Sequence, residues 1–354
     1  MSALETLSAL YADPDAGVRD RRAAGARVVG CVGARAPREL VTAAGLLPVR
    51  LRGQGPPSVL AEDVLGPGVD PPVRRILAGL LEGTLTADFV LIGGDSDSNV
   101  RLFTSLRVLA LDRALPELFF LDLLHVPART SARYGLDRFR ELRAVLARWS
   151  GSPVTDDAIR EAAAEADESC RLLAALSKLR RASPPKLSGA DSLAVIGAGA
   201  SLSAPAYNEI LAALLAETTD PLDNPRQRIY LTGSAHSSPE VYDALESDGS
   251  VVVGEDHSWG EPLSSVPALG DGDPVAALAT RYLADPGPRA ERVAREASAS
   301  GADIVISWIR TGEDALAWEL PALRAALAPT GIPLRVFEHR GLEAPRDADL
   351  AALA

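Results

Sequence analysis

The sequence contains very little cysteine and no excess of positive charge. Cys31 and Cys170 are the only two cysteines among 354 residues. Two thiols cannot build a disulfide framework or a cysteine-rich metal site. Asp and Glu (48) outnumber Lys and Arg (36), which gives a formal net charge of −12. We expect no nucleic-acid partner, because such binding depends on clustered positive charge.

The sequence also lacks long apolar runs. No stretch approaches the roughly 20 apolar residues that span a bilayer, and the amino terminus lacks the basic-then-apolar layout of a signal peptide. We therefore expect a cytoplasmic protein without a membrane partner. The chain is longer than one typical domain, and its 47% of hydrophobic residues are enough for a large core. Two domains are expected.

Short apolar runs alternate with amphipathic stretches of helical period from residue 27 onward. This pattern is typical of βαβ units around a buried parallel sheet. The predicted strands are Arg27–Val32, Leu47–Leu51, Phe89–Ile92, Leu118–Leu121, Leu193–Gly197, Arg228–Leu231, Ser250–Val253, Asp303–Ser307 and Leu334–Phe337. The predicted helices between them are Arg38–Gly45, Pro72–Glu82, Asn99–Leu106, Pro205–Glu217, Pro239–Glu246, Pro274–Ala284 and Glu313–Leu327. The fold class expected from this pattern is α/β.

The middle of the chain has a different pattern. Residues 133–181 are a long polar-faced stretch that is broken at Gly151–Pro153, and Thr155 followed by two aspartates is typical of a helix N-terminus. The paired prolines at 184 and 185 indicate a linker before residue 189. We predict an N-terminal α/β domain over 1–132, a helical connecting segment and linker over 133–188, and a C-terminal α/β domain over 189–354.

Polar residues follow most of the predicted strands. In open α/β sheets, ligands bind at the carboxyl ends of the strands. The segments in question contain Gly33-Ala-Arg35, Asp95-Ser96-Asp97, His236, Asp256-His257 and Glu313-Asp314. Loops of this kind are also rich in Gly, Ser and Asp because they turn the chain and cap helices, which is a structural role open to Asp97 and Asp314 in particular.

Known catalytic motifs are incomplete in these segments. Gly199-Ala-Ser201-Leu-Ser203 lacks the closing glycine of a nucleophile elbow, and Gly197-Ala-Gly199 lacks the third glycine of a dinucleotide fingerprint. The carboxylates and histidines that follow the strands have the chemistry of divalent-metal ligands, but they come from different loops without the spacing of a metal motif. Motifs alone therefore identify no reaction.

The run from Gly30 to Leu51 contains the pattern P-x-E-L-x-x-A-A-G-x-x-P-V-R-L. It resembles the opening motif of the 2-hydroxyacyl-CoA dehydratase and benzoyl-CoA reductase subunit family. The resemblance continues through 88–99, 189–196, 231–260 and 303–338, so it covers nearly the whole chain in order. It implies two flavodoxin-like (Rossmann-like) domains with mostly parallel sheets, joined by a helical segment, around an active site at the domain interface. It also implies a homodimer or a heterodimer with a related subunit.

Members of this family hold a four-iron cluster through cysteines, and an ATP-driven activator supplies one electron for radical loss of a hydroxyl group. The resemblance places the cluster cysteines at Gly33, Ser96 and Glu313 of this chain. A cluster needs three or four thiolate-class ligands. Cys31 lies two residues out of register, and Cys170 falls on a predicted helix. We therefore predict no cofactor and no metal ligands, with a CoA thioester as the substrate group.

This departure leaves three hypotheses for function. The first is a cluster-free, dehydratase-like lyase that acts on a CoA-bound or carrier-bound acyl thioester by acid/base rather than radical chemistry. The second is a non-catalytic partner subunit of a heteromeric 2-hydroxyacyl-CoA dehydratase. The third is an acyl-binding module. The polar replacements Ser96 and Glu313 favour the enzyme, because burying an unpaired carboxylate costs several kcal/mol.

The enzyme hypothesis assigns a role to each polar residue. A carboxyl group shielded from water has a raised pKa and can transfer a proton, which is the role expected of Glu313. A guanidinium group pairs with a carboxylate or a thioester oxygen, which is the role expected of Arg35. The predicted catalytic residues are Glu313, His257, His236 and Ser96, and the predicted substrate-binding residues are Arg35, Asp97 and Asp314.

Overall fold

The computed structural model describes residues 1–354 except 57, 218–219, 262–268, 271 and 343–354. In the described part, eight strands form two sheets, and fifteen α-helices surround them. The strands are β1 (Val28–Val32), β2 (Leu47–Arg50), β3 (Phe89–Gly93), β4 (Glu117–Leu121), β5 (Arg228–Gly233), β6 (Val251–Glu255), β7 (Ile304–Arg310) and β8 (Leu334–Arg340). The helices are α1 (Ala3–Ala12), α2 (Ala16–Ala23), α3 (Arg38–Ala43), α4 (Val59–Leu65), α5 (Pro71–Glu82), α6 (Asp97–Leu109), α7 (Arg129–Ser150), α8 (Asp156–Arg181), α9 (Gly189–Ala198), α10 (Ala204–Ala216), α11 (Glu240–Glu246), α12 (Pro274–Leu283), α13 (Arg289–Ala299), α14 (Asp314–Trp318) and α15 (Leu320–Leu327).

The first sheet has the strand order β2-β1-β3-β4, and all of its strands are parallel. Helices cover both of its faces. On one face Val29 and Leu91 pack with residues of α3, α7 and α12, and on the other Val32 and Val90 pack with residues of α4, α5 and α6. A strand that is buried on both faces needs apolar side chains at successive positions, which is why β1 is an unbroken apolar run in the sequence.

The second sheet repeats this order as β6-β5-β7-β8, again with parallel strands only. Leu231 and Ile306 pack with residues of α1, α9 and α10, whereas Val253 and Val305 pack with residues of α13 and α15. In each sheet the second strand along the chain lies on one side of the first, and the third and fourth strands lie on its other side. The order of the strands therefore reverses between β1 and β3 in the first sheet and between β5 and β7 in the second. Both sheets therefore have a flavodoxin-like order with a switch point, where parallel sheets bind ligands.

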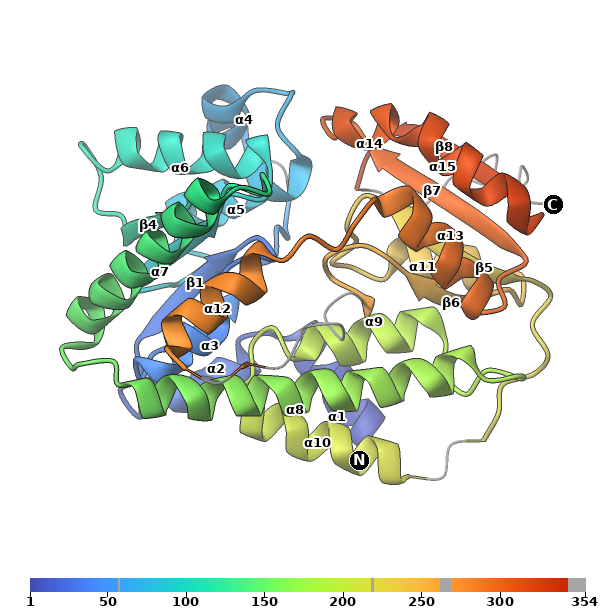
Figure 1. Ribbon diagram of the computed structural model, residues 1–354, viewed down its shortest axis with the longest axis horizontal. Helices are drawn as coiled ribbons and strands as arrows, with labels where there is room; N and C mark the ends of the chain where they lie inside the picture. The colour runs from blue at the N-terminus through green and yellow to red at the C-terminus, as the bar shows by residue number, and fades with distance from the viewer. Residues whose placement is uncertain (57, 218–219, 262–268, 271, 343–354) are drawn as a thin grey trace.

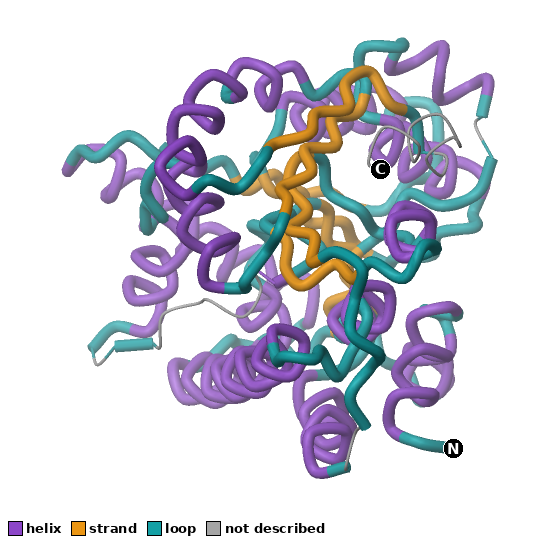
Figure 2. Tube along the Cα trace, turned by 90° about the vertical axis from the view of Figure 1, so that its right-hand side faces the viewer, coloured by secondary structure: helices purple, strands orange, loops and turns teal. Residues whose placement is uncertain are grey.

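The two sheets form two lobes, and α8 runs along one side of both of them (Figure 1). Ile159, near the start of α8, belongs to the core of the first lobe, and Leu172 and Leu176, farther along, belong to the core of the second. Seen from the side, the strands run through the middle of the molecule and helices surround them (Figure 2). One continuous helix thus contributes to the cores of both lobes.

Two helices each pack on a lobe whose strands come from a distant part of the sequence. α1, at the amino terminus, contributes Leu7 and Tyr11 to the core of the second lobe. α12, from the last third of the chain, contributes Val275 and Leu278 to the core of the first lobe. The predicted division at residues 132 and 188 follows chain order and stays a prediction.

Most of the predicted elements are present, with shifts of a few residues at their ends. The predicted strand Leu193–Gly197 is wrong, because these residues belong to α9. Ser188 begins that helix by accepting a hydrogen bond from Asp191 N at 3.0 Å. α9 is buried on nearly all sides, so its short apolar run has no polar face that would reveal the helical period.

The connecting segment consists of two helices, as predicted. α7 ends at Gly151, whose φ of +76° suits glycine, and Thr155 begins α8 by accepting a hydrogen bond from Ala158 N at 3.2 Å. The predicted helix Glu313–Leu327 is divided into α14 and α15, which meet just before Pro321. In the described part of the chain, no helix has the length and apolar character needed to cross a membrane.

Candidate active site

A cavity of about 1250 Å³ opens between the two lobes. The segments that follow β1, β3, β6 and β7 contribute to its wall, together with α8 and the end of α12. Gly33, Asp95, Ser96, Asp256 and Glu313 all line it. The carboxyl ends of strands from both parallel sheets therefore face one common space, as expected for ligand sites in this class of fold.

Glu313 lies directly before α14 and lines the cavity. Its Oε2 atom is buried, lies 3.5 Å from Nη2 of Arg310, and accepts no hydrogen bond in the described structure. Burial raises the pKa of Glu313 above its ordinary 4.5; Arg310 opposes this rise and Asp70 adds to it. A carboxylate in these surroundings is a stronger proton acceptor than an exposed glutamate.

The loops that follow β1 and β3 are joined by Asp95. Its Oδ2 atom accepts hydrogen bonds from Ala34 N at 2.5 Å and Arg35 N at 3.3 Å, and its Oδ1 atom accepts one from Asn99 Nδ2 at 3.3 Å. Gly33 stands next to this carboxylate with a φ of +89°. A Cβ atom at Gly33 would lie 2.6 Å from Asp95 Oδ2 and closer still to Oδ1. The Asp95 carboxylate thus occupies the space of a side chain at position 33.

Ser96, Asp97 and Asp314 lie at helix N-termini. Ser96 begins α6, where its Oγ atom accepts a hydrogen bond from Asn99 N at 3.2 Å, and it lines the cavity. Asp97 and Asp314 lie in the first turns of α6 and α14, are exposed, and are not part of the cavity wall. Of these three predicted residues, the structure brings only Ser96 into the cavity with Glu313.

Arg35 lines the cavity from the loop after β1. Its Nη1 atom lies 2.5 Å from Nε2 of His125 and donates to the carbonyl oxygen of Tyr282 at 3.2 Å. No carboxylate in the described part of the chain forms an ion pair with it. The guanidinium therefore has no competing carboxylate among the described residues, and the assignment of Arg35 to substrate binding stays a prediction.

His236 and His257 do not line the cavity that contains Glu313. His236 lines a smaller cavity of about 200 Å³, and burial lowers its pKa well below the ordinary 6.5. His257 is 3% exposed, and burial lowers its pKa to about 4. The two rings lie edge to face with centroids 5.3 Å apart. Burial thus favours the neutral form of both imidazole rings.

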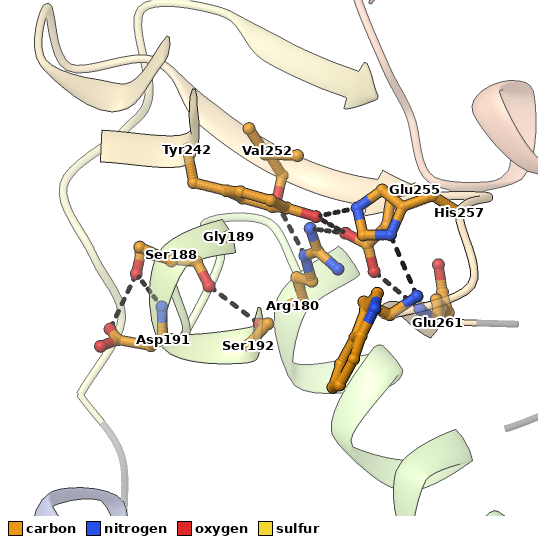
Figure 3. A network of polar contacts seen from close by, with 12 residues as sticks. Arg180, Ser188, Gly189, Asp191, Ser192, Tyr242, Val252, Glu255, His257 and Glu261 are labelled. Atoms are coloured by element: carbon orange, nitrogen blue, oxygen red, sulfur yellow. Dashed lines mark hydrogen bonds and ion pairs between the residues drawn. The ribbon is translucent and has the colours of Figure 1, made fainter. Parts of the chain in front are cut away.

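His257 belongs to a chain of buried hydrogen bonds (Figure 3). Its Nδ1 atom accepts from Trp259 N at 3.3 Å, and its Nε2 atom lies 2.6 Å from the Tyr242 hydroxyl group. Tyr242 donates to Glu255 Oε2 at 3.2 Å, and Glu255 forms a buried ion pair with Arg180. Burial alone would raise the pKa of Glu255, but Arg180 lowers it to about 2. These contacts hold β6, α8 and α11 together.

The two cysteines lie in different surroundings. The Cys31 thiol donates to Val29 O at 3.6 Å inside the core of the first lobe, and burial raises its pKa to about 12. Cys170 is half-buried on α8 and lines the cavity. The positions that resemble the family's cluster cysteines hold Gly33, Ser96 and Glu313, and Asp95 fills the space beside the first of them. These residues do not fit a four-iron cluster, which needs thiolate ligands.

Comparison with known proteins decides the family. The model of the family described as "2-hydroxyglutaryl-CoA dehydratase, D-component" matches residues 34–344. The chain belongs to this family. It is similar to the beta subunit of (R)-2-hydroxyglutaryl-CoA dehydratase from Acidaminococcus fermentans, with 24% identity over 351 residues, 93% of this chain and 91% of that subunit.

The chain is also similar to a protein described as a putative dehydratase subunit, YjiM, of Escherichia coli (strain K12). The two are 32% identical over 142 residues, which are 38% of this chain and 37% of YjiM. The match with YjiM thus spans little more than a third of that protein. The resemblance noted from the opening motif is confirmed at the level of the family.

Sequence reasoning missed several residues of the cavity. Arg38 and Arg50 line it from α3 and β2, and Arg310 lies beside Glu313. Arg38 is the variable second position of the opening motif P-x-E-L-x-x-A-A-G-x-x-P-V-R-L, and Arg50 is the arginine of that motif. An arginine within a buried strand is an unusual placement, and this was the available signal for Arg50.

Proposed function

We propose that the chain is a cluster-free, dehydratase-like lyase that acts on an acyl thioester by acid/base chemistry. The observation that carries this proposal is Glu313, which lines the cavity, has a raised pKa, and has one buried carboxylate oxygen that accepts no hydrogen bond in the described structure and lies 3.5 Å from Arg310 Nη2. It stands at a position where the resemblance expects a cysteine. The family supports dehydratase-like chemistry on an acyl thioester.

Elimination of water can proceed with Glu313 as the one proton carrier. The carboxylate removes a proton from the carbon next to the thioester carbonyl, and the electron pair of that C–H bond forms a carbon–carbon double bond. The C–O bond of the hydroxyl group breaks, the protonated Glu313 gives its proton to the departing oxygen, and water leaves. Arg35 and the Ser96 hydroxyl group, both in the same cavity, orient the thioester. No electron is transferred in this step.

This chemistry defines the position of the hydroxyl group on the substrate. A thioester carbonyl makes the hydrogen on its neighbouring carbon acidic, so the leaving hydroxyl group must be on the next carbon, position 3. A 2-hydroxyacyl thioester would require removal of an unactivated hydrogen, which a carboxylate cannot achieve. The proposal therefore expects turnover of 3-hydroxyacyl thioesters and none of 2-hydroxyacyl thioesters.

Substitution of Glu313 tests the proposal. Glu313→Gln keeps the shape and removes the proton acceptor, so turnover should fall at least about a hundredfold, the usual contribution of a general base. Asp314→Asn is the matched control, because Asp314 is the exposed neighbour outside the cavity wall. Circular dichroism would confirm that both variants fold. Equal turnover in the wild type and Glu313→Gln would refute the role of Glu313.

A second candidate function is that of a non-catalytic partner subunit. The relatives are described as dehydratase subunits. Under this hypothesis the isolated chain is inactive and forms a stable complex with a cysteine-bearing relative encoded beside it. Co-purification with such a relative, together with no turnover by the chain alone, would favour this function.

A further inference from the structure

Asp70 directs its carboxylate toward the other lobe. It stands directly before α5 of the first lobe, where an aspartate commonly accepts hydrogen bonds from the first N–H groups of the helix. The Asp70 side chain accepts none of these, and the first two positions of α5 are prolines, which have no N–H group. Its two oxygens instead lie 3.0 Å from Nε and Nη2 of Arg310, at the end of β7 in the second lobe. Capping of α5 therefore does not account for this carboxylate.

The first lobe fixes the position of Asp70. The Asp70 N–H group donates to Oγ of Ser98, a buried residue of α6, at 3.0 Å. The segment of the second lobe that follows β7 lies close to the same point. A Cβ atom at Gly312 would be 3.4 Å from the carbonyl oxygen of Gly68 and 3.5 Å from Asp70 N. The contact between the lobes therefore includes the backbone next to the ion pair.

Two carboxylates compete for the Arg310 guanidinium group. Its Nη2 atom lies 3.0 Å from Asp70 Oδ2 and 3.5 Å from Glu313 Oε2. Nε donates to Asp70 as well, at 3.0 Å, and Nη1 donates to the carbonyl oxygen of Ala235 at 2.5 Å. Asp70 therefore takes the closest donors, and Glu313 Oε2 accepts no hydrogen bond in the described structure.

The charges around Glu313 make Arg310 the decisive cation. Burial raises the pKa of Glu313, and Asp70 adds to this rise. Arg310 opposes it most, and the Ser234 hydroxyl group and Arg289 oppose it less. Arg289 is itself balanced by ion pairs with two carboxylates, those of Asp256 at 2.8 Å and Glu319 at 3.0 Å. The partner that Arg310 selects therefore sets how strongly Glu313 holds a proton.

We propose that Asp70 is a positioning residue that holds the Arg310 guanidinium group beside Glu313 and keeps it from pairing fully with that carboxylate. This inference rests on the proposed function, because it takes Glu313 as the base. Without Asp70, Glu313 is the nearest carboxylate that Arg310 can bind, and a full ion pair would make Glu313 a weaker base. A base on the second lobe thus depends on a carboxylate of the first.

Titration of Glu313 itself tests this assignment. Carbon-13 NMR of the full chain, labelled at the glutamate carboxyl groups, follows the protonation of Glu313, and Glu313→Gln identifies its signal. Asp70→Asn should lower the proton affinity of Glu313 about tenfold or more, because a cation within about 4–6 Å lowers a carboxyl pKa by about one to three units. Asp63→Asn is the matched control, since Asp63 is exposed on α4 of the same lobe. An unchanged midpoint in Asp70→Asn would overturn the proposal.

Two further variants separate positioning from a simple effect of charge. Arg310→Gln removes the competing cation and should raise the midpoint of Glu313 above that of the wild type. Asp70→Asn added to Arg310→Gln should then lower the midpoint much less than Asp70→Asn lowers it in the wild type, because Asp70 acts through Arg310. Equal lowering in both backgrounds would overturn the proposal by showing that Asp70 acts through its own charge alone.

The design allows for a loss of stability and for failure of the proposed function. Sucrose in every sample favours the folded state, and circular dichroism shows whether each variant has folded. If Asp70→Asn does not fold, Arg310→Gln and the double variant still decide. A midpoint that does not rise in Arg310→Gln, or that falls about tenfold on addition of Asp70→Asn, would overturn the proposal. No substrate is present, so full turnover in Glu313→Gln would refute the proposed function separately.

Discussion

Arg310 and Asp70 form a bidentate ion pair that joins the two lobes. Nε and Nη2 of Arg310, at the end of β7, each lie 3.0 Å from an oxygen of Asp70, which precedes α5 of the first lobe. Arg310 is 2% exposed and also donates to the carbonyl oxygen of Ala235. Its remaining neighbour is Glu313 at 3.5 Å. The Arg310 guanidinium group therefore both joins the two lobes and lies beside the proposed base, Glu313.

Loss of the Asp70 charge should destabilise the protein. Asp70→Asn leaves the Arg310 guanidinium buried with only the more distant Glu313 to balance it, and breaking a buried pair in this way costs about 3 kcal/mol. Urea unfolding at pH 7 would measure the change in free energy of unfolding. Asp13→Asn is the control, because Asp13 pairs with Arg19 on the surface and exposed pairs contribute about 0–1 kcal/mol. Equal losses in the two variants would contradict this account of Arg310.

Stability should fall in acid because His257 is buried in its neutral form. Its pKa is about 4 in the folded protein and 6.5 when unfolded. As the pH falls, His257 is therefore protonated in the unfolded chain before it is protonated in the folded protein. The contribution of His257 is complete above pH 6.5 and is lost between pH 6.5 and 4. A pKa unit corresponds to about 1.4 kcal/mol, so the loss is about 3 kcal/mol.

The variant His257→Gln removes this titration. Urea unfolding between pH 7 and pH 4 should give a shallower dependence of the free energy of unfolding on pH than in the wild type. His339→Gln, at an exposed position on β8, is the control and should keep the wild-type slope. If His257→Gln keeps the full slope as well, His257 is not the buried neutral group that its contacts indicate.

A side chain at position 33 should be poorly tolerated because of Asp95. Gly33→Ala combines a φ of +89° with a close contact to the Asp95 carboxylate, whereas Gly25→Ala combines a φ of +91° with open space. Both lose about 1 kcal/mol from backbone strain, and Gly33→Ala should lose about 2 kcal/mol more from overpacking. Thermal or urea unfolding measures both. The extra loss should disappear in the double variant with Asp95→Ala, and its persistence there would exclude Asp95 as the cause.

The proposed base predicts a dependence of turnover on pH. Glu313 must be ionised to remove a proton, and its pKa lies above the ordinary 4.5. Turnover should therefore be constant at higher pH and should fall as the pH drops through this raised value. Asp314→Asn should leave the midpoint unchanged. A rate that increases toward acid pH would instead identify Glu313 as a group that must start protonated.

The sequence predicted the α/β class with parallel sheets and the edge of the sheets where the cavity lies. An apolar run such as Val28–Val32 is unambiguous as a strand, since flanking glycines and helices bound it. The polar residues that follow β3 and β7 therefore had to lie at the ends of strands. The run Leu193–Gly197 was wrong because a fully buried helix and a buried strand have the same apolar composition.

The composition of the cavity was harder to predict than its position. His257 follows a strand as expected, yet it turns toward Tyr242 on α11 and away from the cavity, a choice that depends on how α11 packs on the sheet. Arg50 and Arg310 depend on contacts with the opposite lobe, at Ser258 and Asp70. Such pairs join residues more than 200 positions apart, and local pattern does not encode them.

Iron content is the most direct test of the central claim, a D-component family member that works without an iron–sulfur cluster. The chain would be purified without oxygen and measured by elemental analysis together with its visible absorption spectrum. The account predicts only trace iron and no absorption in the visible range, with turnover of a 3-hydroxyacyl thioester unaffected by an iron chelator. Stoichiometric iron with the charge-transfer absorption of a cluster would contradict it and would restore radical chemistry.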